Sequence, residues 1–310
     1  MIQRFLSLFF FIVFANYLSA QDKKDTTILV DHNFITLSEV VVNNQLDVPY
    51  FISRVKNDTT FYKAFRNLRI IGYNSINDIR MLNKDGNIQA SLRSKTQQIR
   101  QDNCRSMKVL EETATGDIYD ADKNFNYYTA QMYASLFFTK GKVCGETNIV
   151  KGHDFSASNL KGMEKHKQQL KMLFFNPGRK IDGLPFISNK TAIFDESMAD
   201  KYDMDIDYKS YNGQPCYVFS IKAKDNKRSK VVVEEMVTWF TEKDFQIVHR
   251  NYSLNYDAGV YDFDVNMDVQ MVRVGDLLVP GVLTYKGNWK AIFKKRERGV
   301  FTATLSDFKL

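Results

Sequence analysis

The sequence predicts an α+β fold in which antiparallel sheet dominates. The last third of the chain alternates apolar and polar residues over several long runs, as half-buried strands do, while helical spacing is confined to a few shorter segments. Of the 310 residues, 44% are apolar and 14% aromatic, enough to bury a sizeable core. No Pro/Gly/Ser-rich linker interrupts the chain, so we expect a single β-rich domain over 49–310, preceded by a leader over 1–20 and an arm with one short strand over 21–48.

The first twenty residues predict a secretory signal peptide. Arg4 supplies the positive charge, Phe5–Phe14 the apolar segment, and Ser19 and Ala20 small residues for cleavage after Ala20. The apolar segment is shorter than the roughly 20 residues that a membrane span needs. Gln21, the next residue, is not the Cys that accepts lipid in bacterial lipoproteins. We therefore expect an exported protein whose signal peptide is removed.

The next segments predict an arm followed by two helices. The polar residues 21–33 predict a loose arm, and the β-branched run Ile35–Val42 predicts a short strand. Pro49 suits the first position of a helix over Pro49–Lys56, and Asp58 can cap a second, amphipathic helix over Thr59–Leu68 that packs on a sheet.

From residue 73 to 141 the pattern favours strands. The Asp85–Gly86 pair predicts a hairpin turn, and further strands are expected at Ser106–Leu110 and Tyr127–Thr139. The loop 120–131 has the acidic spacing of a calcium loop, but Phe125 and Gln131 occupy the positions that require Gly and Glu, so we expect a polar loop and no metal site.

A longer helix is expected after Ser158 or Asn159, and it ends at 176–178. Its apolar stripe, which is either ordinary core or the lid of a cavity, consists of Leu160, Met163, Leu170, Leu173 and Phe174. Beyond it, strands are predicted at Tyr202–Tyr208, Tyr217–Ile221, Val231–Phe240, Phe245–Tyr252 and Tyr261–Met271.

The charge of the chain disfavours a nucleic-acid-binding protein, and its cysteines leave the disulfide pairing open. The excess of +7 is spread along the chain, and its densest cluster, over 290–298, predicts a solvated strand and turn or contact with acidic membrane head groups. No nucleic-acid partner is expected. Three pairings of Cys104, Cys144 and Cys216 are open, and Cys216 has the setting of a small buried hydrophobic residue.

The sequence predicts no catalytic residues, no metal site and no cofactor. The four histidines occur singly, and no HExxH, GxSxG, P-loop or GxGxxG pattern is present. The aspartates that alternate along residues 203–207 and 262–268 suit a solvent-facing side of a sheet, with lysines as cross-strand partners. A triad assembled from distant residues stays open, but the pattern favours a binding protein over an enzyme.

Two segments carry a resemblance to a known family. Tyr211–Phe219 (YNGQPCYVF) and Val237–Arg250 (VTWFTEKDFQIVHR), followed by Leu277–Gly281 (LLVPG), resemble the outer-membrane lipoprotein carrier superfamily, the LolA/LolB-like proteins. The resemblance covers about 202–289. It implies a strongly curved antiparallel sheet, an unclosed barrel, that helices cover and that holds acyl chains or another apolar ligand.

The resemblance also implies a set of ligand-binding residues. Trp239 would line the cavity wall and Arg250 would lie near its mouth. The remaining lining residues would be Tyr217, Phe219, Tyr261, Phe263, Val265, Met267, Leu170 and Phe174.

Two functions follow as hypotheses. The first is a non-catalytic envelope protein that binds an apolar ligand, a lipid or a lipoprotein acyl chain, in the periplasm or at the periplasmic face of the outer membrane. The second is an interaction or scaffold protein with a solid core and an outer-membrane protein as partner. Leu37–Val42 (LSEVVV) resembles a segment of Bacteroidetes envelope proteins and supports the same location in the bacterial envelope.

Overall fold

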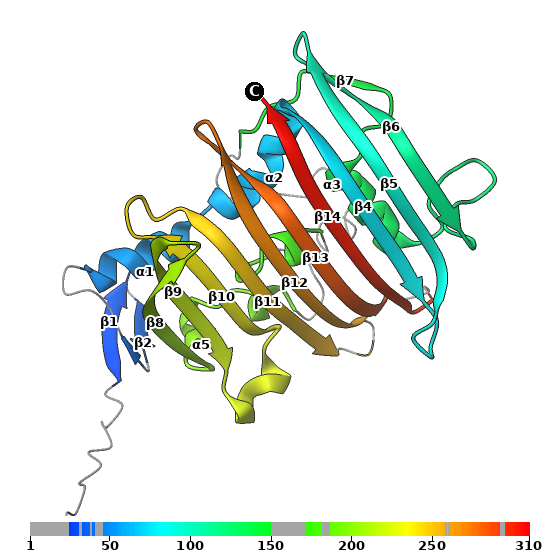
Figure 1. Cartoon of the computed structure of the whole chain (residues 1–310). Coiled ribbons are helices and arrows are strands. Elements are labelled where there is room, and N and C mark those ends of the chain that lie inside the picture. The colour runs from blue at the N-terminus through cyan, green and yellow to red at the C-terminus, as the bar shows by residue number, and fades with distance from the viewer. Residues whose placement is uncertain are drawn as a thin grey trace, which may run out of the picture.

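The computed structural model describes residues 25–30, 33–37, 39–40, 46–149, 171–181, 187–257, 259, 261–291 and 295–310. A broad twisted sheet forms one layer, and the helices lie on one of its two faces (Figure 1). The helices are α1 (Val48–Asn57), α2 (Thr60–Asn67), α3 (Tyr128–Phe137) and α5 (Glu196–Ala199), with the shorter 3-10 helices η1 (Leu68–Ile70), η3 (Ser188–Lys190) and η4 (Asp225–Lys230). This arrangement confirms the predicted α+β class.

The described strands of the large sheet number twelve, in the order β3-β8-β9-β10-β11-β12-β13-β14-β4-β5-β6-β7. Their bounds are β3 (Glu39–Val40), β4 (Gly72–Leu82), β5 (Ile88–Gln101), β6 (Cys104–Thr115), β7 (Lys142–Cys144), β8 (Tyr202–Tyr211), β9 (Gln214–Ala223), β10 (Val233–Thr241), β11 (Ile247–Asp257), β12 (Tyr261–Val274), β13 (Leu277–Ala291) and β14 (Glu297–Lys309). All neighbours are antiparallel except β3 and β8. The sheet is not closed, because β3 and β7 form separate edges.

The strand order joins the two halves of the chain. From β8 to β14 each strand pairs with its successor, and β14 then pairs with β4, so that the hairpin β4–β5 extends the same sheet. The predicted strands of the last third and the Asp85–Gly86 hairpin are confirmed.

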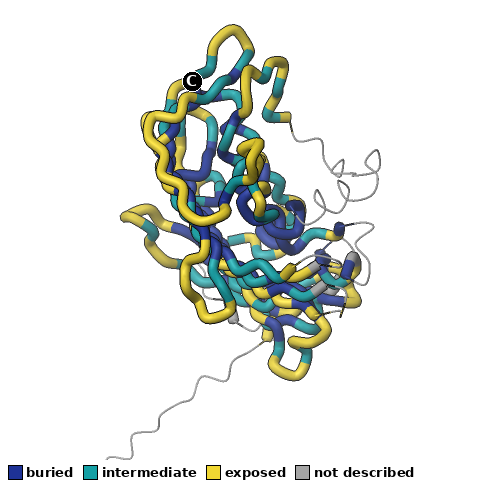
Figure 2. The backbone as a smooth tube through the Cα atoms, turned by 90° about the vertical axis from the view of Figure 1, so that its right-hand side faces the viewer, coloured by how far each residue is buried: buried dark blue, intermediate teal, exposed yellow. Residues whose placement is uncertain are grey.

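Buried residues lie where the sheet and the helices face each other, while loops and strand ends are exposed (Figure 2). Along β8 and β12, every second residue points into this layer, as their alternating burial shows. The helix starts follow the sequence: Asp47 caps α1, which begins next to Pro49, and the Asp58 carboxylate accepts hydrogen bonds from the main-chain N–H groups of Thr60 and Phe61.

Two predicted elements differ from the structure. The segment Tyr127–Thr139, expected as a strand, contains α3, because its buried residues recur at helical spacing: Thr129, Ala130, Met132, Tyr133 and Phe137. The arm expected to be loose contains β1 (Thr26–Val30), which pairs with β2 (Asn33–Leu37) in a separate two-stranded sheet. The predicted strand Ile35–Val42 is thus divided between β2 and β3, and residues 41–45 lie outside the described part.

The disulfide is Cys104–Cys144, which ties β6 to β7. Cys216 is a free thiol with no exposed surface, in keeping with its predicted role as a small buried residue. The loop 120–131 has the acidic spacing of a calcium loop. It begins with a turn in which the Asp120 carboxylate accepts hydrogen bonds from the N–H groups of Asp122 and Asn124.

Candidate functional site

Most of the predicted lining residues come together on the helix-covered face of the sheet. They are Tyr217 and Phe219 on β9, Phe263, Val265 and Met267 on β12, Arg250 on β11, and Phe174 in the helical stretch 171–175, all of them buried. Their rings contact one another and the covering helices; the Phe174 ring lies 6.1 Å from that of Phe263, and the Phe51 ring on α1 lies 5.6 Å from that of Tyr217. Leu170 and the side chain of Tyr261 lie outside the described part.

Trp239 lies on the opposite face. It pairs with Val218 and His249 across the sheet, whereas its neighbour Thr238 pairs with Phe219 and Arg250. Cross-strand partners share a face and consecutive residues alternate. This corrects the position expected for Trp239, because it points away from the helices and from the other predicted lining residues.

Arg250 is a buried cation in the apolar layer. Its side chain is 5% exposed, its Nε donates to the Thr238 hydroxyl at 2.9 Å, and its guanidinium lies 4.3 Å from the centre of the Phe61 ring on α2. No ion pair between Arg250 and a carboxylate is found within the described residues. Burial lowers the pKa of Arg250 to about 10, and the charge of Asp58 offsets part of that effect.

A mouth opens next to this cation, between the junction of α1 and α2 and the turn from β10 to β11. Its volume is about 240 Å³, and its lining consists of Phe51, Arg54, Val55, Asn57, Asp58, Thr59, Thr60, Phe240 and Phe245. Phe240 points to the same side as Thr238 two residues away, about 7 Å along the strand. Arg250, the cross-strand partner of Thr238, therefore lies on the same face as Phe240, two residues farther along the sheet from the mouth.

Charge at the mouth is only partly balanced. The Arg179 guanidinium donates to the main-chain oxygen of Asp58, and both Arg179 and Arg250 interact electrostatically with the Asp58 carboxylate. Two cations thus share one carboxylate that lines the mouth. Such a site favours a ligand that combines an apolar body with an anionic group.

Under α3, the same face of the sheet holds a buried polar network. The Asn77 Oδ1 on β4 accepts from the hydroxyls of Ser75 and Tyr133, and its amide lies 3.2 Å from the Ser94 hydroxyl. The network lies within the apolar layer, because the Tyr133 ring also packs on that of Phe301 at 4.8 Å and Ile79 and Met81 of β4 are buried as well. Sequence reasoning missed it, because Asn77 and Ser94 look like ordinary outward residues of a hairpin.

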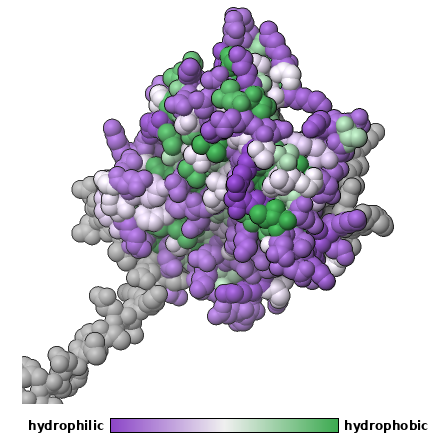
Figure 3. All heavy atoms as spheres, turned by 45° about the vertical axis from the view of Figure 1, so that its right-hand side comes forward, coloured by the Kyte–Doolittle hydropathy of each residue, from purple (hydrophilic) through white to green (hydrophobic). Residues whose placement is uncertain are grey.

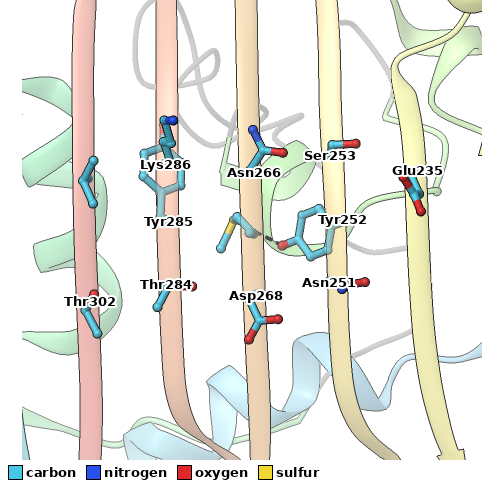
Figure 4. A pocket seen from close by; sticks show the side chains of 12 residues that line it. Glu235, Asn251, Tyr252, Ser253, Asn266, Asp268, Thr284, Tyr285, Lys286 and Thr302 are labelled. Atoms are coloured by element: carbon cyan, nitrogen blue, oxygen red, sulfur yellow. Dashed lines mark hydrogen bonds between the residues drawn. The ribbon is translucent and has the colours of Figure 1, made fainter. Parts of the chain in front are cut away.

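The helix-free face holds a second concavity, a trough of about 520 Å³ across β10 to β14 (Figure 4). It is lined by Glu235, Asn251, Tyr252, Ser253, Asn266, Met267, Asp268, Thr284, Tyr285, Lys286, Val300 and Thr302. The side of the molecule seen in Figure 3 is largely hydrophilic, with hydrophobic residues in separate groups.

Other kinds of site were sought in the described residues. They contain no group of three or more His, Cys, Asp and Glu side chains placed to hold a metal ion. None of the helices in that part of the chain combines the length and the apolar composition of a membrane span.

Comparison with known proteins gives a weak likeness. No protein-family model and no curated protein matches the chain. Among solved structures, a DUF1329 family protein from Desulfovibrio piger is 13% identical, with a TM-score of 0.28, over 83% of this chain and 92% of that one. A putative outer membrane lipoprotein-sorting protein domain from Vibrio parahaemolyticus is 9% identical, with a TM-score of 0.26, over 79% of this chain and 88% of that one.

The description of this second structure names the same kind of protein as the sequence resemblance does. Identities and TM-scores at this level carry no function to this chain.

Proposed function

We propose that the protein is an exported, non-catalytic binding protein of the bacterial envelope. It holds an apolar or amphiphilic ligand, a lipid or a lipoprotein acyl chain, between α1 and α2 and the apolar face of the sheet. The observation that carries this proposal is the mouth between α1, α2 and the β10–β11 turn, whose lining residue Asp58 interacts with a buried, incompletely balanced cation, Arg250.

The rim of the mouth suits entry of an amphiphile. Tyr50 on α1 is 53% exposed, and the guanidinium of Arg54 lies 5.1 Å from the centre of the Phe245 ring on the facing turn. This cation–ring contact is worth about 0.5–1 kcal/mol at an exposed site. The Phe245 ring also packs on the rings of Tyr50 and Phe51 of α1, at 6.5 and 5.8 Å, so a ligand that enters between α1 and the turn must replace these contacts. Its apolar part gains about 0.8 kcal/mol for each CH₂ group that it buries.

The first test is lipid extraction and native mass spectrometry of the purified protein, followed by titration with an apolar fluorescent probe. In Asn57→Trp, a large ring at an exposed position of the lining obstructs the mouth, so probe binding should weaken about tenfold or more. Thr113→Trp, an exposed position on β6, is the matched control and should bind as the parent does. Absence of both bound lipid and probe binding in the parent would refute the proposal.

A second test separates ligand binding from folding. Burying a charge without a paired counter-ion is costly, and the lowered pKa of Arg250 reflects that cost, so Arg250→Met should retain or raise the free energy of unfolding. It should nevertheless weaken binding of an anionic amphiphile such as oleate more than binding of its uncharged methyl ester. Equal loss for both ligands would show that Arg250 does not contact the anionic group.

The scaffold hypothesis also has an observation in its favour. Part of the layer under the helices is already filled by ring contacts, with the rings of Tyr285 and Phe301 stacked at 4.3 Å and those of Phe65 and Phe175 at 5.4 Å. A protein that carries no lipid, binds no probe and recovers a defined outer-membrane protein from envelope extracts would support this alternative.

A further inference from the structure

The trough on the helix-free face is built from two rows of side chains that cross the strands. Asn251, Asp268, Thr284 and Thr302 are successive cross-strand partners from β11 to β14, and so are Ser253, Asn266, Lys286 and Val300. Neighbouring strands are about 4.8 Å apart, so the rows form a close grid of polar groups. In Figure 4 these side chains lie side by side along five consecutive strands, with Glu235 at the β10 end.

The trough is separate from the apolar layer, although the two share strands. Tyr252, Met267 and Tyr285 alternate with the polar residues and are buried on the helix side, where the Tyr252 hydroxyl donates to the main-chain oxygen of Phe174. The polar side chains of the trough therefore point away from the apolar layer, on the opposite face of the same strands.

Hydrogen-bonding groups in the trough are turned outward. Elsewhere on this face charged residues pair with each other, as Arg80 does with Asp78 at 2.5 Å and Lys95 with Glu111 at 2.9 Å. By contrast, the side chains of Asn251, Thr284 and Lys286 form no hydrogen bond or ion pair within the described part of the chain. Hydroxyl, amide and ammonium groups are thus gathered in one concavity and left available to a ligand.

Aromatic rings lie next to one end of the trough, outside its lining. Trp239 and His249 form the adjacent cross-strand pair, and the Tyr211 ring stacks on that of His249 at 5.5 Å and lies 5.5 Å from that of Trp239. The His249 Nε2 atom is 2.7 Å from the Asp268 carboxylate, which joins these rings to the polar grid. An aromatic face with outward amides and hydroxyls beside it matches a ligand that has both C–H faces and many hydroxyl groups.

Other ligand classes fit less well. Glu235 and Asp268 outnumber Lys286, the one cationic side chain of the lining, and this balance disfavours phosphates and nucleic acids. The strands β10 to β14 are paired on both sides, so an extended peptide cannot add to them as it adds to a sheet edge.

We propose that this trough is a second binding site, for a neutral oligosaccharide, with Trp239 as a stacking surface and Asn251, Asp268 and Thr284 as hydrogen-bonding partners. Its volume of about 520 Å³ lies within the usual 300–1,000 Å³ of small-ligand sites. The proposal is independent of the apolar ligand proposed for the other face.

The chain offers its own reporter for a test. It has two tryptophans, and Trp289 is 4% exposed with its Nε1 donating to the Thr129 hydroxyl, so Trp289→Phe leaves Trp239 as the single tryptophan. This variant is titrated with chito-, cello-, malto- and manno-oligosaccharides and with peptidoglycan fragments, and positive cases are repeated by calorimetry on the parent protein. At least one saccharide should give a saturable change in Trp239 emission.

Two matched variants locate the binding. Thr284→Arg places a long side chain in the middle of the trough and should weaken saccharide binding about tenfold or more. Thr113→Arg makes the same change in the same cross-strand row but outside the lining, and should leave binding unchanged. Both should bind the apolar probe like the parent, so failure here is distinguishable from failure of the proposed lipid site.

The inference is overturned if no member of the panel changes the emission or gives heat at millimolar concentration. It is equally overturned if Thr284→Arg and Thr113→Arg bind a saccharide with the same affinity.

Discussion

Glu297 caps a helix that lies 168 residues earlier in the chain, and its removal should destabilise the fold. Its carboxylate accepts from the N–H groups of Tyr128 and Thr129, both at 2.8 Å, and from the Thr129 hydroxyl at 2.7 Å. These are the first N–H groups of α3, which have no partner inside the helix. Thr129 has no exposed surface, so water cannot readily replace the carboxylate.

The expected cost follows from these contacts. Loss of an N-terminal cap costs about 0.5–2 kcal/mol, and each buried donor left without an acceptor costs about 1–3 kcal/mol. Tyr128 is half-buried, so water can take over its N–H, whereas the N–H and the O–H of the buried Thr129 lose their acceptor. We therefore expect Glu297→Ala to lower the free energy of unfolding by about 2–3 kcal/mol. Glu297→Gln keeps one acceptor oxygen and should cost less.

The assay is urea unfolding of the disulfide-bonded protein, with far-UV circular dichroism and fluorescence as probes. Glu111→Ala is the control, because it makes the same change at an exposed ion pair with Lys95, worth about 0–1 kcal/mol. If Glu297→Ala destabilises no more than Glu111→Ala, the capping account of α3 is refuted.

Three further predictions concern the cysteines and a buried ion pair. Cys144→Ser opens a loop of 40 residues and should lower the free energy of unfolding by about 4 kcal/mol, and a reducing agent should then have no further effect on the unfolding midpoint. Cys216 should resist a thiol reagent until urea unfolds the protein, since burial both hides its thiol and raises its pKa; reaction in the native state at the rate of a free thiol would contradict this. Burial favours a raised pKa for Glu146, but hydrogen bonds and charge from Arg105 and Arg69 outweigh it and hold the pKa below 4.5. That stabilisation is present above pH 4.5 and lost as pH falls through the folded pKa, so Glu146→Gln should be less stable than the parent at pH 7 and differ less from it at pH 3, as measured by urea unfolding.

The strands of the last third could be predicted because alternation alone specifies them. Six apolar residues from Tyr261 to Met271 alternate with polar ones, and only a strand places them on one face. The helix α3 could not be predicted in this way, because its run of aromatic and small residues fits both periods. The cap that favours the helix, Glu297, is supplied by β14 and becomes a neighbour only after the sheet has formed.

The two candidate sites differ in how far the sequence reveals them. The apolar face is visible as a pattern, and Phe219, Phe263 and Met267 were placed on it correctly. The trough is not visible, because Asn251, Asp268 and Thr284 are each an ordinary outward residue of a separate strand. Only the register of β11 to β13 brings them together.

Trp239 and Phe240 show why residue type alone could not assign the faces. Both are large aromatic residues at the end of one strand, and consecutive residues point to opposite sides of a sheet. Pairing decides between them: Phe240 lies opposite Tyr217 and Ile247 on the helix side, and Trp239 lies opposite Val218 and His249 on the other. A shift of one residue would bury Trp239 and expose Phe240, exchanging the linings of the two sites. The register of β10, and not its composition, therefore determines which ligand each ring could meet.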